Sequence, residues 1–100
     1  MTEKAITIVS AWSTRSHFNR DGNVDYTTTH PKPEHLDFYL EDGALMLANA
    51  AVKDMSLKSN TLTIKEIFVT GDCYVTEFHL RSVDKEALQH FLVETTKKGG

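Results

Sequence analysis

The stretch Asp42–Leu57 reads DGALMLANAAVKDMSL, and its pattern decides the fold that we expect for the whole chain. Alanine, leucine and methionine are strong helix formers. The apolar side chains recur at the i, i+3, i+4 and i+7 spacing that stacks them on one face of a helix. They belong to Ala44, Leu47, Ala48, Ala51, Val52 and Met55. We therefore predict a helix over residues 43–57, with Asp42 as its N-cap.

The preceding segment, residues 34–41, is compatible with two structures. Its apolar residues alternate with polar ones, and Asp42-Gly43 is a strong signal for a two-residue hairpin turn, so 35–41 and 44–50 would be paired strands. The same apolar residues also extend the helical stripe, and only Gly43 opposes one long helix, at about 1 kcal/mol relative to alanine. The sequence leaves open whether 34–41 is helix or strand.

Four further segments are expected to be strands because they are rich in β-branched and aromatic residues. Two of them flank a polar turn at residues 19–23, and two flank Gly71-Asp72, whose glycine suits a positive φ. The strands are expected at residues 5–15, 24–29, 61–70 and 73–81.

The end of the chain carries the signature of a second helix. Asp84 is placed as its N-cap, and Val83 and Leu88 are placed as a hydrophobic staple. Its inner face is expected to consist of Leu88, Phe91, Leu92 and Thr95.

Together these elements predict a single α+β domain over residues 1–100. Its order is ββαββα, with an antiparallel sheet of about four strands and two helices packed on one face. An unpaired edge of such a sheet invites another chain, so we expect a possible homodimer through the sheet.

The composition excludes some classes of function. With 40% hydrophobic and 25% charged residues, the chain has the composition of a globular domain. Its net charge of −3 gives no general reason to bind nucleic acid or an anionic membrane. The single cysteine, Cys73, cannot form an internal disulfide, and the N-terminus lacks the apolar core of a signal peptide. We expect a cytoplasmic protein.

No motif indicates a metal, a cofactor or catalysis. The five histidines lack the short spacing of zinc ligands, since His30 and His35 are separated by a segment with two prolines. Cys73 opens a predicted strand, where nothing local lowers its pKa toward that of a nucleophile. We therefore expect no metal and no cofactor, and a binding protein rather than an enzyme.

The segment 12–20 has the composition of an interface. It contains the only tryptophan and two arginines without an acidic residue, and such residues anchor protein contacts. The predicted binding residues are Trp12, Arg15, His17, Phe18 and Arg20. Our first hypothesis is a small regulatory or protein-binding module that contacts a protein partner through this segment.

Two other functions remain open. Tyr74, Glu77 and His79 lie on one predicted strand and supply the polar groups for a small-ligand or enzymatic site. The aromatic and arginine residues of 12–20 also suit stacking on single-stranded nucleic acid, but the acidic remainder of the chain places this third.

Overall fold

The fold is one antiparallel sheet of eight strands followed by one helix, in a computed structural model that describes the backbone of residues 5–99 and the side chains of residues 5–93. The elements are β1 (Ala5–Phe18), β2 (Val24–His30), β3 (Glu34–Glu41), β4 (Ala44–Leu47), β5 (Ala50–Ala51), β6 (Met55–Lys58), β7 (Thr61–Ile67), β8 (Cys73–Leu80) and α1 (Ser82–Gly99). The sheet order is β5-β4-β3-β1-β8-β7-β6, and β2 pairs with β1 off this path. The predicted α+β fold with two helices and about four strands is therefore wrong.

The main error is the helix predicted over residues 43–57, where the structure has three short strands. Asp42 and Gly43 have φ angles of 54° and 83°, and Ala48 and Asn49 have 51° and 71°. Positive φ at both central residues is the type I′ geometry that joins antiparallel strands through two residues. The two turns thus reverse the chain twice within a stretch whose spacing also fits a helix.

The open question of residues 34–41 is settled in favour of a strand, β3. Leu36 and Phe38 are opposite Ile8 and Ile6 of β1, and Glu41 pairs with Ala44 across the Asp42-Gly43 turn. Leu36 and Phe38 are almost completely buried. The alternation of apolar and polar residues was the correct signal here, because it places both large side chains on the buried face.

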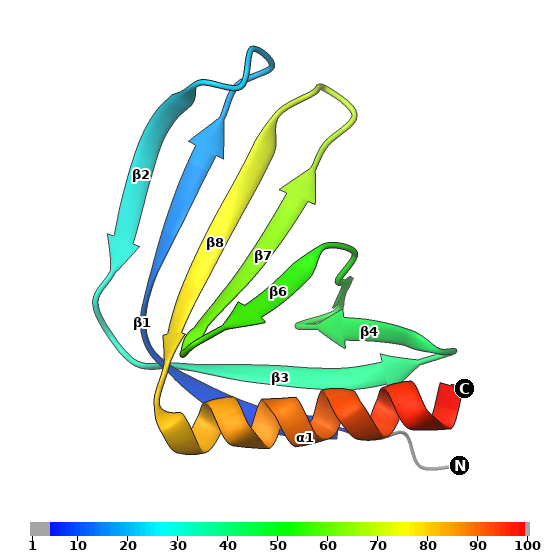
Figure 1. The fold of residues 1–100 in the computed structure, drawn as a ribbon. Coiled ribbons are helices and arrows are strands. Elements are labelled where there is room, and N and C mark those ends of the chain that lie inside the picture. The colour runs from blue at the N-terminus through cyan, green and yellow to red at the C-terminus, as the bar shows by residue number, and fades with distance from the viewer. Residues whose placement is uncertain (1–4, 100) are drawn as a thin grey trace.

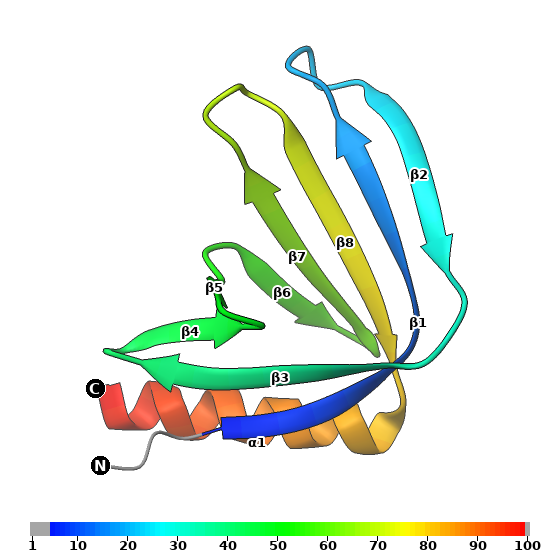
Figure 2. The same ribbon diagram turned by 180° about the vertical axis from the view of Figure 1, so that it is seen from behind.

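β1 is the longest strand and organises the sheet. Its first part, Ala5–Ser10, pairs with β3, and its second part, Ser13–Phe18, pairs with β2. The pairing of β1 with β8 shifts between Ser10 and Trp12. Such a bulge bends a strand. Figure 1 shows the result, in which β3 and the start of β1 run along α1 while β2, β8 and β7 rise away from it. The view from behind shows the same bent sheet (Figure 2).

The core fills the angle of this bent sheet. It consists of side chains from β1, β3, β7, β8 and α1, namely Ile8, Leu36, Phe38, Leu62, Ile64, Phe78, Leu80, Leu88 and Phe91. Leu88 and Phe91 confirm the inner face predicted for the helix, and Leu92 packs against the core. Thr95, also predicted on this face, is outside the described side chains.

The start of α1 differs from its prediction. The helix begins at Ser82, so Asp84 lies within its first turn and is not the N-cap. Asp84 is buried, and its carboxylate accepts the Val9 backbone N–H at 3.0 Å and the Arg81 Nε–H at 2.6 Å. Val83 is 65% exposed and forms no staple. Asp84 therefore attaches the helix to β1. The contact lies on the part of β1 that does not pair with β8.

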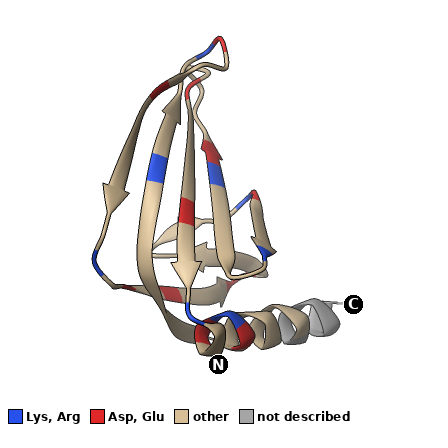
Figure 3. Ribbon diagram, turned by 60° about the vertical axis from the view of Figure 1, so that its left-hand side comes forward, with Lys and Arg blue, Asp and Glu red and all other residues tan. Residues whose placement is uncertain are grey.

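Charges of both signs are interspersed along the strands and the start of the helix (Figure 3). Among the described residues, no helix has the length and apolar character that crossing a membrane requires.

Candidate functional site

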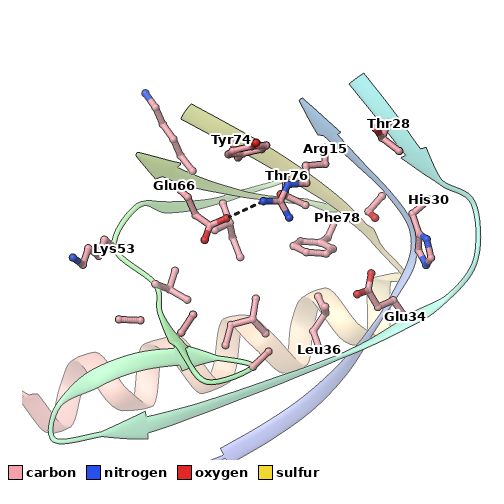
Figure 4. Close-up of a pocket in the computed structure, with 18 of the residues that line it drawn as sticks. Arg15, Thr28, His30, Glu34, Leu36, Lys53, Glu66, Tyr74, Thr76 and Phe78 are labelled. Atoms are coloured by element: carbon pink, nitrogen blue, oxygen red, sulfur yellow. Dashed lines mark ion pairs between the residues drawn. The ribbon is translucent and has the colours of Figure 1, made fainter. Parts of the chain in front are cut away.

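The concave side of the sheet encloses a cavity of about 950 Å³. It is lined by residues of β1, β2, β3, β7 and β8 and by the segment 47–53 (Figure 4). Pockets for small molecules typically measure roughly 300–1,000 Å³. The cavity is therefore large enough for a ligand, although the whole chain has only 100 residues.

The floor of the cavity is apolar. Leu36, Ile64 and Phe78 line it and are each less than 10% exposed. The wall formed by residues 47–53 is lined by small or aliphatic side chains, those of Leu47, Ala48, Ala50, Ala51 and Val52. An apolar group placed against this floor and wall would lose part of its contact with water, and burial of apolar surface stabilises binding by about 25 cal/mol per Å².

The upper wall is polar, and the strand register fixes its arrangement. Arg15 of β1 is directly opposite Thr28 of β2 on one side and Thr76 of β8 on the other. One step along β1 toward α1, Ser13 is flanked by His30 and Phe78 in the same way. All six side chains line the cavity. Arg15 thus lies at the middle of a cross-strand array of polar groups.

Arg15 has few partners in this array. Its Nη2 lies 3.7 Å from Glu66 Oε1, an ion pair too long for a hydrogen bond. Its guanidinium carbon lies 4.5 Å from the centroid of the Tyr74 ring. This cation–π contact holds the guanidinium over the ring and uses none of its N–H groups as hydrogen-bond donors. Figure 4 shows Arg15 and Glu66 meeting within the cavity.

Tyr74 and Tyr26 lie beyond Arg15 toward the hairpin tips. The hydrogen-bonding contact with Tyr26 raises the pKa of Tyr74, and burial adds to this effect. Tyr74 is therefore a protonated hydroxyl at neutral pH. It adds a donor to the wall that carries Arg15.

The side chain of His17 lies between two carboxylates and has a structural role. Its Nδ1 is 3.0 Å from Asp25 Oδ2, and its Nε2 is 3.2 Å from Asp72 Oδ1. The hydrogen bond from Thr70, followed by the contact with His17, lowers the pKa of Asp72. His17 thus connects the β1–β2 hairpin to the loop between β7 and β8.

The residues predicted from segment 12–20 do not form one patch. Arg15 lies in the cavity, whereas the register places Trp12 and Phe18 on the opposite, convex face. Trp12 is 41% exposed. Arg20 is in the β1–β2 loop, with its side chain against Gly71.

The second predicted set, Tyr74, Glu77 and His79, is also divided. Tyr74 lines the cavity, while Glu77 and His79 face the convex side. The His79 ring stacks on Trp12 with 3.8 Å between the ring centroids. The structure therefore makes two contacts between the predicted sets. Arg15 contacts Tyr74, and Trp12 contacts His79.

Sequence reasoning missed Thr28, Thr76 and the small side chains at 48, 50 and 51. The threonines become recognisable only once the register with Arg15 is known. Ala48 and Ala51 were assigned to the apolar face of a predicted helix and Ala50 to the same helix, so no cavity wall was expected from them.

Comparisons with protein-family models, with curated proteins and with solved structures find no match to this chain. Within the described residues, no group of three or more His, Cys, Asp or Glu side chains is arranged to hold a metal ion.

Proposed function

We propose that this protein binds a small amphipathic molecule in the cavity of its bent sheet. The observation that carries the proposal is a cavity of about 950 Å³ with a buried apolar floor below a polar wall. Ligand sites combine an apolar lining with a few polar groups that fix the orientation of the ligand. This is the ligand-binding alternative raised by the sequence, but with a different set of residues.

The arrangement favours binding over catalysis. The Arg15 guanidinium has only N–H donors, and contact with Tyr26 raises the pKa of Tyr74 above its ordinary value of 10.0, so neither group is suited to accept a proton. The nearest acidic group, Glu66, has a side chain that is 45% exposed. These groups are suited to holding and orienting a ligand.

The test uses a substitution on one strand that fills part of the cavity. Thr76→Trp places an indole in the middle of the cavity wall, and Thr63→Trp places the same ring on the side of β7 that does not line the cavity. Binding of the amphipathic anionic dye 8-anilinonaphthalene-1-sulfonate, measured by fluorescence, should fall at least 10-fold in Thr76→Trp and stay within 2-fold in Thr63→Trp. Equal binding by both variants would contradict the proposed site, provided that both melt cooperatively.

The first hypothesis from the sequence, a protein-binding surface, has one specific observation in its favour. Trp12 is 41% exposed on the convex face and stacks on His79. Exposed aromatic residues of this kind anchor protein interfaces. We keep it as a second candidate function, tested by capture of a stoichiometric protein partner with the native chain but not with Trp12→Ala.

A further inference from the structure

We infer that the ligand carries an oxyanion, a carboxylate or a phosphate monoester, which binds at Arg15 while its apolar part lies on the cavity floor. This inference rests on the proposed function and specifies the chemical class of the ligand. The evidence is the position, aromatic contact and unsatisfied bonding capacity of one guanidinium.

The position of Arg15 follows from the register. β1 is the middle strand of the upper wall, so Arg15 has a neighbour on each side, Thr28 and Thr76. Both are hydroxyl-bearing and line the cavity. Hydroxyls on both sides of a guanidinium give an oxyanion several donors from one plane of the sheet.

The guanidinium is held near an aromatic ring before a ligand arrives. Its carbon lies 4.5 Å from the centroid of the Tyr74 ring, and the ring of Tyr74 is itself in edge contact with Phe68. An arginine held over an aromatic ring has fewer accessible positions and loses less entropy on binding. Planar, two-oxygen anions match the planar guanidinium best.

The bonding capacity of the guanidinium is largely unused. A guanidinium has five N–H donors. Among the described residues, its one ion pair is with Glu66 at 3.7 Å, beyond hydrogen-bond length, and the two side chains are 52% and 45% exposed. Exposed pairs of this kind contribute little to stability. An anionic ligand that makes two short hydrogen bonds would therefore displace Glu66 at small cost.

The apolar floor explains how the rest of the ligand is held. Phe78 follows Thr76 at the next position on the same face of β8, and Ile64 is opposite Thr76 on β7. A molecule whose head lies at Arg15 would thus extend its body over Phe78, Ile64 and Leu36. The ligand class is an apolar chain or ring system of modest size with one terminal anion.

The experiment compares three probes with the same apolar chain, dodecanoate, dodecyl phosphate and dodecanol, the two anions below their micellar concentrations and the alcohol below its solubility limit. Affinities are measured by titration calorimetry, and the site is located by NMR shifts. We expect at least one anion to bind 10-fold or more tightly than the alcohol, and the tighter of the two anions identifies the head group.

Two variants then test the role of Arg15 with opposite signs. Arg15→Met should weaken binding of the preferred anion by about 10- to 100-fold, the range expected for lost hydrogen bonds to a charged group. Glu66→Gln should strengthen it by roughly 2- to 5-fold, because the competing carboxylate is gone. Arg15→Lys keeps the charge without the planar fork and should give an intermediate loss. Arg20→Met, a change in the hairpin loop, is the matched control and should leave the affinity unchanged.

Each other outcome is decisive. If dodecanol binds as tightly as both anions, or if Glu66→Gln weakens anion binding, the inference about Arg15 is wrong while the ligand site stands. If none of the three probes binds to the folded protein, the inference and the proposed ligand site both fail.

Discussion

Replacing Ala48 by glycine is expected to stabilise this protein, although the same change in a helix is destabilising. Ala48 is exposed and has a φ of 51°, and an L-residue in the left-handed region costs about 1–2 kcal/mol. Glycine removes that strain but gains entropy in the unfolded chain, which offsets about 0.4–1 kcal/mol. We expect Ala48→Gly to raise the free energy of unfolding by about 0.8 kcal/mol, the difference between the midpoints of these two ranges.

The reverse change in the preceding turn provides the matched partner. Gly43 has a φ of 83°, and a Cβ built on it meets no atom within 4 Å, so Gly43→Ala introduces backbone strain without a clash. It should lower the free energy of unfolding by a similar amount, about 0.8 kcal/mol. In a chain of this length, 1 kcal/mol corresponds to a shift in Tm of roughly 4–8 °C.

Thermal and urea unfolding of both variants, monitored by circular dichroism, measures these shifts. A helix over residues 43–57 requires the opposite signs, because glycine costs about 1 kcal/mol relative to alanine in a helix interior. A lower Tm for Ala48→Gly together with a higher Tm for Gly43→Ala would refute the two-turn structure and restore the helix.

Three other changes test the core, the helix attachment and the convex face. Phe38→Ala removes a fully buried ring and should lower the free energy of unfolding by about 3–5 kcal/mol; a loss under 1 kcal/mol in urea unfolding would contradict its place in the core. Asp84→Asn should cost about 1.5–3 kcal/mol at pH 7 because the carboxylate accepts two hydrogen bonds. The hydrogen bond from Arg81, supported by the Val9 N–H, lowers the pKa of Asp84, so this stabilisation is complete above its ordinary value of 3.8 and is lost as the pH falls through the lowered pKa. Urea unfolding of the native chain between pH 2 and 7 should show that loss, and Asp84→Asn should lack it; parallel pH profiles for the two proteins would count against the contact. Finally, His79→Ala removes the ring stacked on Trp12 and should increase acrylamide quenching of the only tryptophan, with unchanged quenching as the contrary result.

The sequence predicted those elements whose local signals all agree. β2, β7, β8 and the C-terminal helix overlap the segments expected from their composition. The stretch 43–57 failed because its apolar spacing fits a helix, while the turn residues Asp42-Gly43 and Ala48-Asn49 fit two reversals. Tertiary pairing decided between them, since β4 joins β3 in register and a helix would leave that edge unpaired.

The site was predictable only in part, for a reason of periodicity. In a strand, neighbouring residues point to opposite faces, so a compositional patch such as 12–20 is divided between the two sides of the sheet. Arg15 and Tyr74 were both identified as candidates, but in different sets. Their contact depends on the register of β1 with β8, which contains a bulge between Ser10 and Trp12 that the sequence does not mark.

The alanines that misled the helix prediction have a physical role in the fold. Ala48, Ala50 and Ala51 line the same cavity as Arg15. Alanine is a poor strand former, and a larger β-branched residue at the two strand positions, Ala50 and Ala51, would favour the strand and fill the space. A short wall of small side chains in a sheet therefore gives up local stability and leaves volume open. The lost stability has a reason if a ligand occupies the open volume. This connects the unexpected strands of 43–57 to the ligand site.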